Sequence, residues 1–277
     1  MTVTSTEKSS ASQVLDDLDF ELHDREGGDW TDDQKSQLSQ ELRTFASTCL
    51  FPLPDYNCLS SNFSTAFDDK IIAIARSSTT REIMGFTSAV FLKGFNDKSV
   101  PFVLHTGLTC VSENLRRQNL TIFLFYHIFY HLCYSYPEGF WLSNLAGITS
   151  SLGSISRYGT SVYPSPSLPT PSPMHRLIAK TIDLCHRDKM LVSSSAVFDS
   201  ERFVFLGSNQ PGSCFYKDRD DVRYADRQST INEFYRKLLR KNGGDEVLQV
   251  AFVNSEQLVD SRYESRFEKL EDRKSKL

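Results

Sequence analysis

The stretch that decides the fold is Cys110-Val-Ser-Glu-Asn-Leu-Arg-Arg-Gln-Asn-Leu-Thr121, which joins two apolar runs. Residues 100–111 predict a long strand, and residues 120–134, apolar on all sides, predict a buried helix. The first N–H groups of a helix are unpaired and lie at the positive end of its dipole, so they bind anions. Because Arg116 and Arg117 add forked donors, the turn at 116–121 is predicted to hold a pyrophosphate group.

The elements around this stretch alternate between helix and strand signals. Thr31, followed three residues later by Gln34, predicts a capped helix that runs to about residue 47. The remaining predicted elements are a β-hairpin over 70–76 and 82–92, a strand over 139–145, a helix over 150–158, a helix over 174–188, a strand over 198–206, a helix over 228–241 and a strand over 246–253. This order predicts a mixed α/β (α+β) fold.

The chain divides by composition into a tail, one domain and a second tail. Residues 1–30 are polar, acidic and rich in serine, which predicts a disordered N-terminal tail. Residues 31–254 form the domain, with a core over 32–163 and a C-terminal part over 174–254. Five prolines within 164–173 predict an extended connection between the two, and residues 255–277 are a charged tail.

Composition limits the classes of partner and compartment. The chain has 277 residues, a net charge of −4 and a pI near 5.9, so nucleic acid is not the expected partner. We find no signal peptide and no apolar run that spans a bilayer comfortably, and we expect a soluble, cytoplasmic protein without a membrane partner. The six cysteines form no CxxC pair, which indicates reduced thiols, with Cys110 and Cys133 in the core.

The junction and its surroundings resemble the GNAT superfamily of acyl-CoA N-acyltransferases. The family signature, Arg/Gln-x-x-Gly-x-Gly/Ala, falls on residues 116–121 here, with Asn119 and Thr121 in place of the two glycines. The resemblance covers residues 32–163, including a strand that ends at Asn144 and a short helix that ends in Tyr158-Gly159. Asparagine is the non-glycine residue that best tolerates a left-handed turn, and the Thr121 hydroxyl can donate to a phosphate oxygen.

The resemblance implies a fold and an activity. The fold is a mixed, mostly antiparallel sheet with one parallel pair, flanked by helices and completed by a C-terminal extension. The activity is N-acyl transfer, with acetyl-CoA or another acyl-CoA as co-substrate, to an amine-bearing small molecule or peptide by direct attack on the thioester. No metal is implied, because His127 and His131 lack the glutamate and the third ligand of a zinc site.

The resemblance also assigns residues to roles. Tyr158 is the expected acid, with Tyr163 as the second candidate, and His105 is the expected base, with Glu113 ranked below it. The backbone N–H of Leu108 is expected to polarise the thioester carbonyl. The residues expected to bind the coenzyme are Leu108, Thr109, Cys110, Val111, Arg116, Arg117, Gln118, Asn119, Leu120, Thr121 and Asn144.

Each assignment has a structural alternative. His105 can be a hydrogen-bonded core histidine, Tyr158 an amphipathic residue at a helix end, and Asn144 a helix cap. The two arginines can be a solvated helix start. At the level of function, the alternatives are a non-catalytic module of the same fold that binds a ligand or a protein, and a different α/β enzyme with a phosphate-bearing substrate.

Overall fold

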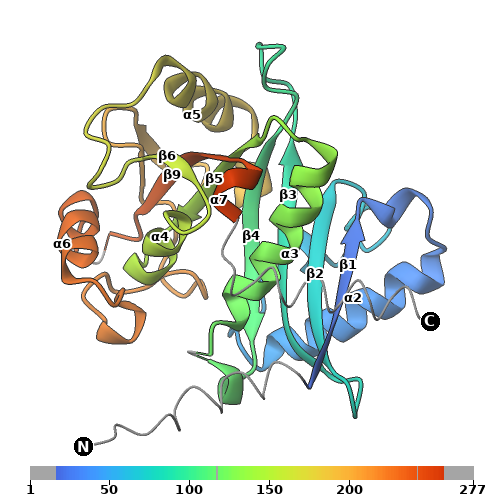
Figure 1. The fold of residues 1–277 in the computed structure, drawn as a ribbon. Coiled ribbons are helices and arrows are strands. Elements are labelled where there is room, and N and C mark those ends of the chain that lie inside the picture. Colours follow the sequence, from blue (N-terminus) through green and yellow to red (C-terminus); the bar gives the residue numbers. More distant parts are fainter. Residues whose placement is uncertain (1–16, 117, 242, 259–277) are drawn as a thin grey trace, which may run out of the picture. The chain divides into compact units, whose positions relative to one another are not determined.

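The computed structural model describes residues 17–116, 118–241 and 243–258, drawn in Figure 1. These residues divide into two compact units, a first unit of 17–89 with 108–128 and a second unit of 90–107 with 129–258. The strands are β1 Leu18–Asp24, β2 Lys70–Ser77, β3 Ile83–Leu92, β4 Val103–Val111, β5 Phe140–Ala146, β6 Thr160–Tyr163, β7 Val197–Asp199, β8 Val204–Leu206 and β9 Glu246–Val253. The α-helices are α2 Asp32–Ser47, α3 Leu120–Ser135, α4 Thr149–Ile155, α5 Pro173–Cys185, α6 Ser229–Leu238 and α7 Ser255–Leu258.

The strands hydrogen-bond in the order β1-β2-β3-β4-β5-β9-β8-β7, and β6 pairs with β9. The ladder between β4 and β5 is parallel, and it joins residues 103–106 to residues 141–144. The ladders β1–β2, β5–β9, β6–β9, β7–β8 and β8–β9 are antiparallel. The predicted mixed, mostly antiparallel sheet with one parallel pair is therefore confirmed.

In the first unit, two helices cover opposite faces of β3. A Cβ atom on Gly85 would lie 3.0 Å from the side chain of Leu120 in α3, so this position faces α3. The next residue, Phe86, makes an edge-to-face ring contact with Phe45 of α2. Successive residues of a strand point to opposite faces, so α2 and the first half of α3 enclose β3 between them. The capping box predicted for Thr31 and Gln34 is present at the start of α2.

The strand β1 corrects the prediction of a disordered tail over residues 1–30. All seven residues from Leu18 to Asp24 pair antiparallel with β2, between Ser77 and Ile71. The sequence Leu18-Asp-Phe-Glu-Leu-His-Asp alternates apolar and polar residues, which is the period of a strand. The acidic composition of the whole tail concealed this short pattern. Residues 1–16 of the expected tail lie outside the described residues.

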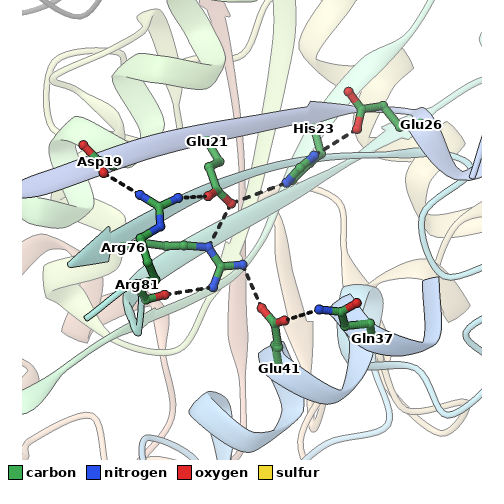
Figure 2. A network of polar contacts seen from close by, with 8 residues as sticks. All are labelled: Asp19, Glu21, His23, Glu26, Gln37, Glu41, Arg76 and Arg81. Carbon is green, nitrogen blue, oxygen red and sulfur yellow. Dashed lines mark hydrogen bonds and ion pairs between the residues drawn. The ribbon is translucent and has the colours of Figure 1, made fainter. Parts of the chain in front are cut away.

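Arg76 of β2 links β1 to α2, as Figure 2 shows. Its Nε donates to Glu21 of β1 at 2.9 Å, and its Nη2 donates to Glu41 of α2 at 2.8 Å. The side chain of Arg76 is only 15% exposed, whereas that of Arg81, which contacts Asp19 and Glu21, is 56% exposed. Buried charged hydrogen bonds are worth more than exposed ones, so Arg76 is the stronger link.

We expect Arg76→Met to lower the free energy of unfolding by about 2 kcal/mol, because Glu21 and Glu41 each lose a partly buried charged hydrogen bond. The hydrogen bonds that Arg81 and Gln37 still donate to these carboxylates are exposed. The exposed Arg81→Met is the matched control, with an expected loss below about 1 kcal/mol. Urea denaturation followed by circular dichroism measures both variants. Equal losses from the two arginines would contradict the role assigned to Arg76.

In the second unit, the last strand, β9, lies between other strands of the sheet. It pairs with β5 from Val247 opposite Ala146 to Val253 opposite Phe140, and it also pairs with β6 and β8. Residues 164–245 therefore form the connection along the chain between β6 and β9, two strands that pair with each other. The C-terminal part extends the sheet through β9, β8 and β7.

Neighbouring residues of β9 face two separate apolar cores of the second unit. Leu248 packs in a cluster with Ile178 and Ile182 of α5. Val247 packs in another with Leu152 of α4 and Tyr235 of α6. This alternation places α5 on one face of β9 and both α4 and α6 on the other.

Two predicted elements need correction. The expected strand over 198–206 is two short strands, β7 and β8, paired as a hairpin, because the chain turns at residues 200–203. The predicted buried helix, α3, exposes Tyr130 and Tyr134, which are 43% and 90% exposed and share one helix face. The segment expected as a charged tail, a solvated helix or a frayed end, begins with the short helix α7, and residues 259–277 lie outside the described residues.

Candidate functional site

The turn between β4 and α3 contains a residue in the left-handed conformation, directly before the helix start. A short 3-10 helix over Glu113–Leu115 follows β4, and α3 begins at Leu120. Asn119 has a φ of 66°, in the left-handed region that glycine adopts most readily. Its carbonyl accepts hydrogen bonds from the N–H groups of Ile122 and Phe123, at 2.8 and 3.3 Å. Asn119 thus adopts the left-handed conformation that an asparagine was expected to tolerate.

The side chains of this turn differ in their exposure to solvent. Arg116 and Asn119 are exposed and Thr121 is half-buried, whereas Leu120 is buried at 1% exposure. Gln118 is held in place, because its Nε2 donates to the Asn114 carbonyl at 2.8 Å. Arg117 lies outside the described residues. The exposed polar groups, at the positive end of the α3 dipole, can meet an anion here.

The end of β4 presents alternating side chains in the same unit. Leu108 and Cys110 are buried, and Thr109 and Val111 are half-buried. The Thr109 hydroxyl pairs with that of Thr87 in β3 at 2.7 Å. The structure therefore brings together, within the first unit, the four strand residues and the turn that the sequence analysis assigned to one coenzyme.

Cys49 is a residue of this region that the sequence analysis did not assign. It follows α2, and its Sγ lies 3.7 Å from the carbonyl oxygen of Val111, 62 positions along the chain. The Cys110 side chain is hydrogen-bonded to Cys49, and Arg116 faces the same thiol. These two contacts lower the pKa of the Cys49 thiol to about 6, although partial burial opposes them. A contact over this separation leaves no local pattern in the sequence.

His105 lies in the core of the second unit. Its Nδ1 is 3.0 Å from the Ser143 hydroxyl of β5, and the residue is 2% exposed. Burial, together with repulsion from His186, lowers the pKa of His105 to about 3. The imidazole is therefore neutral at physiological pH and a weak proton acceptor.

Asn144 belongs to a buried chain of hydrogen bonds. Its Oδ1 accepts from the Thr106 hydroxyl at 2.9 Å, and its Nδ2 donates to Gln249 at 3.0 Å. The Nε2 of Gln249 donates onward to the Tyr235 hydroxyl at 2.6 Å, and that hydroxyl donates to the Pro164 carbonyl at 2.9 Å. Because both amide atoms of Asn144 have partners in the protein, its placement is structural.

The other acid–base candidates, Tyr158, Tyr163 and Glu113, lie in different surroundings. Tyr158 is 2% exposed and packs edge to face on Phe129 at 5.3 Å. The Tyr163 hydroxyl donates to the Glu201 carbonyl at 2.9 Å. Glu113, at the start of the 3-10 helix after β4, is exposed.

Two other kinds of site need particular features of the chain: a metal centre needs clustered ligands, and a membrane span needs a long apolar helix. In the described ranges, no three His, Cys, Asp or Glu side chains gather in a group that could hold a metal ion. Across those ranges, too, no helix combines the length and apolar character that crossing a membrane requires.

Comparison with known proteins gives structural likeness only. No family model matches the sequence, and no curated protein matches it. Arabidopsis thaliana NAA60 in complex with acetyl-CoA aligns over 85% of this chain and 98% of its own, with 13% identity and a TM-score of 0.38. An aminoglycoside acetyltransferase from an uncultured soil metagenomic sample, in complex with sisomicin, aligns over 44% of this chain and 74% of its own, with 14% identity and a TM-score of 0.33. Another aminoglycoside acetyltransferase from such a sample aligns over 43% and 72%, with 17% identity and a TM-score of 0.31. These are the kinds of solved structure to which the chain is similar.

Proposed function

We propose that this protein is an acyl-CoA-dependent N-acyltransferase that takes acetyl-CoA as its co-substrate. The observation that carries the proposal is the left-handed Asn119 between β4 and the start of α3. It gives the turn the backbone conformation that glycine adopts most readily, at a position where the GNAT signature has one of its glycines. The start of α3 then directs the positive end of the helix dipole toward a pyrophosphate.

The proposed roles follow from the placement of the first-unit residues. The backbone of Leu108, Thr109, Cys110 and Val111 binds the pantetheine arm, and the N–H of Leu108 polarises the thioester carbonyl. Arg116, Gln118, Asn119, Leu120 and Thr121, together with Arg117, bind the pyrophosphate. The exposed guanidinium of Arg116 supports this assignment, since a forked donor suits phosphate oxygens. Asn144 contributes by holding β5 in place.

The acceptor is an amine that attacks the thioester directly. Direct attack needs the two reactants to be held close together, and it needs little acid–base help when the amine arrives unprotonated. We assign Tyr158 as the acid and His105 as the base within this proposal. The substrate class is an amine-bearing small molecule or peptide.

The burial of these two residues favours a second candidate function. A histidine with a pKa of about 3 is poorly matched to proton transfer near neutral pH, and Tyr158 lies in an aromatic core. A module of the same fold that binds acetyl-CoA or a protein without turnover fits both observations. Coenzyme binding combined with a turnover assay distinguishes the two functions, because only the enzyme releases free thiol in the presence of an amine. Unchanged turnover in Tyr158→Phe would remove Tyr158 from the acid role.

Calorimetric titration with acetyl-CoA tests whether the left-handed Asn119 favours binding of the coenzyme. We expect wild-type protein to bind, and Asn119→Gly to bind several-fold more tightly, because glycine keeps the left-handed backbone and removes the side chain beside the phosphate. Leu191→Gly is the matched control. Leu191 has a φ of 54°, so glycine stabilises the fold there by about 1 kcal/mol while the affinity for acetyl-CoA stays unchanged.

Two outcomes would overturn the proposal. The first is no binding by wild-type protein or by Asn119→Gly at millimolar acetyl-CoA, with both variants folded. The second is an equal change in affinity from Asn119→Gly and Leu191→Gly, which would make the effect one of general stability.

A further inference from the structure

Two cysteines from distant parts of the sequence meet in the first unit. Cys49 follows the end of α2, and its Sγ lies 3.7 Å from the carbonyl oxygen of Val111, the residue after Cys110 in β4. A Cβ atom on Gly85, which faces α3, would lie 3.5 Å from the Val111 side chain, so the side chain of Cys110 points to the opposite face, toward α2. A side-chain hydrogen bond joins Cys110 to Cys49 there. Cys49 is half-buried and Cys110 is 2% exposed. Neither forms a disulfide in the structure. An oxidant from solution therefore reaches Cys49 first, and a second thiol stands directly behind it.

The surroundings of Cys49 stabilise its thiolate. Its pKa is lowered to about 6 by the hydrogen bond from Cys110 and by the positive charge of Arg116, the charged group that faces it. Three features oppose this: partial burial, the negative end of the α2 dipole, and the Val111 carbonyl, which accepts only from the protonated thiol. The contacts that lower the pKa of Cys49 outweigh these three features.

Two other thiols of the chain have pKa values that are shifted in the opposite direction. Burial raises the pKa of Cys58 to about 11, and it raises the pKa of Cys133 to about 11. A thiol in such surroundings is protonated at neutral pH and reacts slowly with peroxides. Cys49 differs from both in having a second thiol as its hydrogen-bond partner, which is the largest cause of its lowered pKa.

We propose that Cys49 and Cys110 form a peroxide-reactive pair, in which Cys49 is oxidised first and Cys110 then closes a disulfide. A partly exposed thiolate beside a resolving cysteine is the usual arrangement of a redox-sensitive site. The oxidation of the pair needs no acyl transfer, although Cys110 and Arg116 also belong to the proposed coenzyme site.

The two steps balance with a hydroperoxide as the oxidant. The Cys49 thiolate attacks the terminal peroxide oxygen, the O–O bond breaks, and the alkoxide leaves and takes up a proton. The Cys110 sulfur then attacks the sulfur of the Cys49 sulfenic acid, the S–O bond breaks, and water leaves with the Cys110 proton. The two thiols lose two electrons, and the peroxide gains them.

The first test measures the alkylation rate of each cysteine against pH, by iodoacetamide labelling and peptide mass spectrometry of the full chain. We expect the rate at Cys49 to reach half its maximum near pH 6, and the midpoint to rise in Arg116→Gln. Cys185, an exposed cysteine at the end of α5, is labelled in the same samples as the reference for an accessible thiol. A Cys49 midpoint at the ordinary thiol value of about 8.5 would overturn the proposal.

The second test treats the protein with one equivalent of hydrogen peroxide and maps its peptides. We expect a linked peptide that contains Cys49 and Cys110 and weighs two hydrogens less than the separate peptides. In Cys110→Ser, dimedone should trap a sulfenic acid at Cys49, and in Cys49→Ser, Cys110 should stay reduced. Circular dichroism confirms that both variants fold. Oxidation of wild-type protein at Cys185 alone, or at Cys49 without the linked peptide, would contradict the pair, and this result needs no variant.

Discussion

Replacing Gln249 with methionine is expected to lower the free energy of unfolding by about 3–5 kcal/mol. Gln249 is fully buried in β9 and joins Asn144 of β5 to the Tyr235 hydroxyl of α6. It also donates to the Leu152 carbonyl at 3.2 Å. Methionine keeps the length of the side chain but removes the acceptor of the Asn144 amide and the donor to the Tyr235 hydroxyl and the Leu152 carbonyl. Each buried hydrogen bond lost in this way costs about 1–3 kcal/mol.

Chemical denaturation of wild-type protein and two variants measures this effect. Gln210→Leu is the control, because Gln210 is an exposed glutamine in the same unit with a long contact of 3.5 Å to the Gly207 carbonyl. We expect that control to change the free energy of unfolding by less than about 0.5 kcal/mol. A loss below about 1 kcal/mol for Gln249→Met would show that the chain of hydrogen bonds does not secure Asn144.

Replacing Glu246 with glutamine is expected to remove a pH dependence of stability worth about 3 kcal/mol. Glu246 begins β9, is 8% exposed, and accepts a hydrogen bond from the Ser208 hydroxyl at 2.5 Å. Burial raises its pKa from 4.5 to about 7, although the hydrogen bonds from Ser208 and Asn209 lower it. A shift of this size corresponds to about 3 kcal/mol.

The sign follows from the direction of the shift. Below pH 4.5 the carboxyl is protonated in both the folded and the unfolded chain, so its contribution to stability is fully present. Between pH 4.5 and about 7 the unfolded chain ionises while the folded protein stays protonated, so stability falls as the pH rises. Above pH 7 the loss is complete and constant.

The measurement is the difference in unfolding free energy between Glu246→Gln and wild type, taken at pH 4 and at pH 8. We expect this difference to favour the variant by about 3 kcal/mol more at pH 8 than at pH 4. Glu201→Gln, the same substitution at a side chain that is 80% exposed, is the control for the change from carboxyl to amide. A flat difference for Glu246→Gln would mean that the carboxyl is ionised in the folded protein.

Helices and strands with strong local signals were predictable from the sequence. The Thr31 capping box, the hairpin that became β2 and β3, and the strand over 246–253 are all observed. Each signal comes from residues a few positions apart. Where a signal was short or mixed with another composition, as in β1 or in the pair β7 and β8, the prediction was wrong.

The candidate site was predictable in part for the same reason. The conformation of Asn119 depends on its own side chain and on the start of the next helix, both of which are local. The environment of His105 is not local, since the low pKa comes from burial and from His186. The contact between Cys49 and the end of β4 likewise depends on how α2 packs.

The sequence by itself determined the strand–turn–helix at residues 110–121, because cap, periodicity and turn residues act through neighbours along the chain. Only the tertiary structure decided that β9 lies beside β5, that Gln249 secures Asn144, and that Cys49 meets Cys110. Such contacts join residues tens of positions apart, and they form only when apolar faces pack together. For this reason their hydrogen bonds and altered pKa values leave no pattern that a single sequence displays.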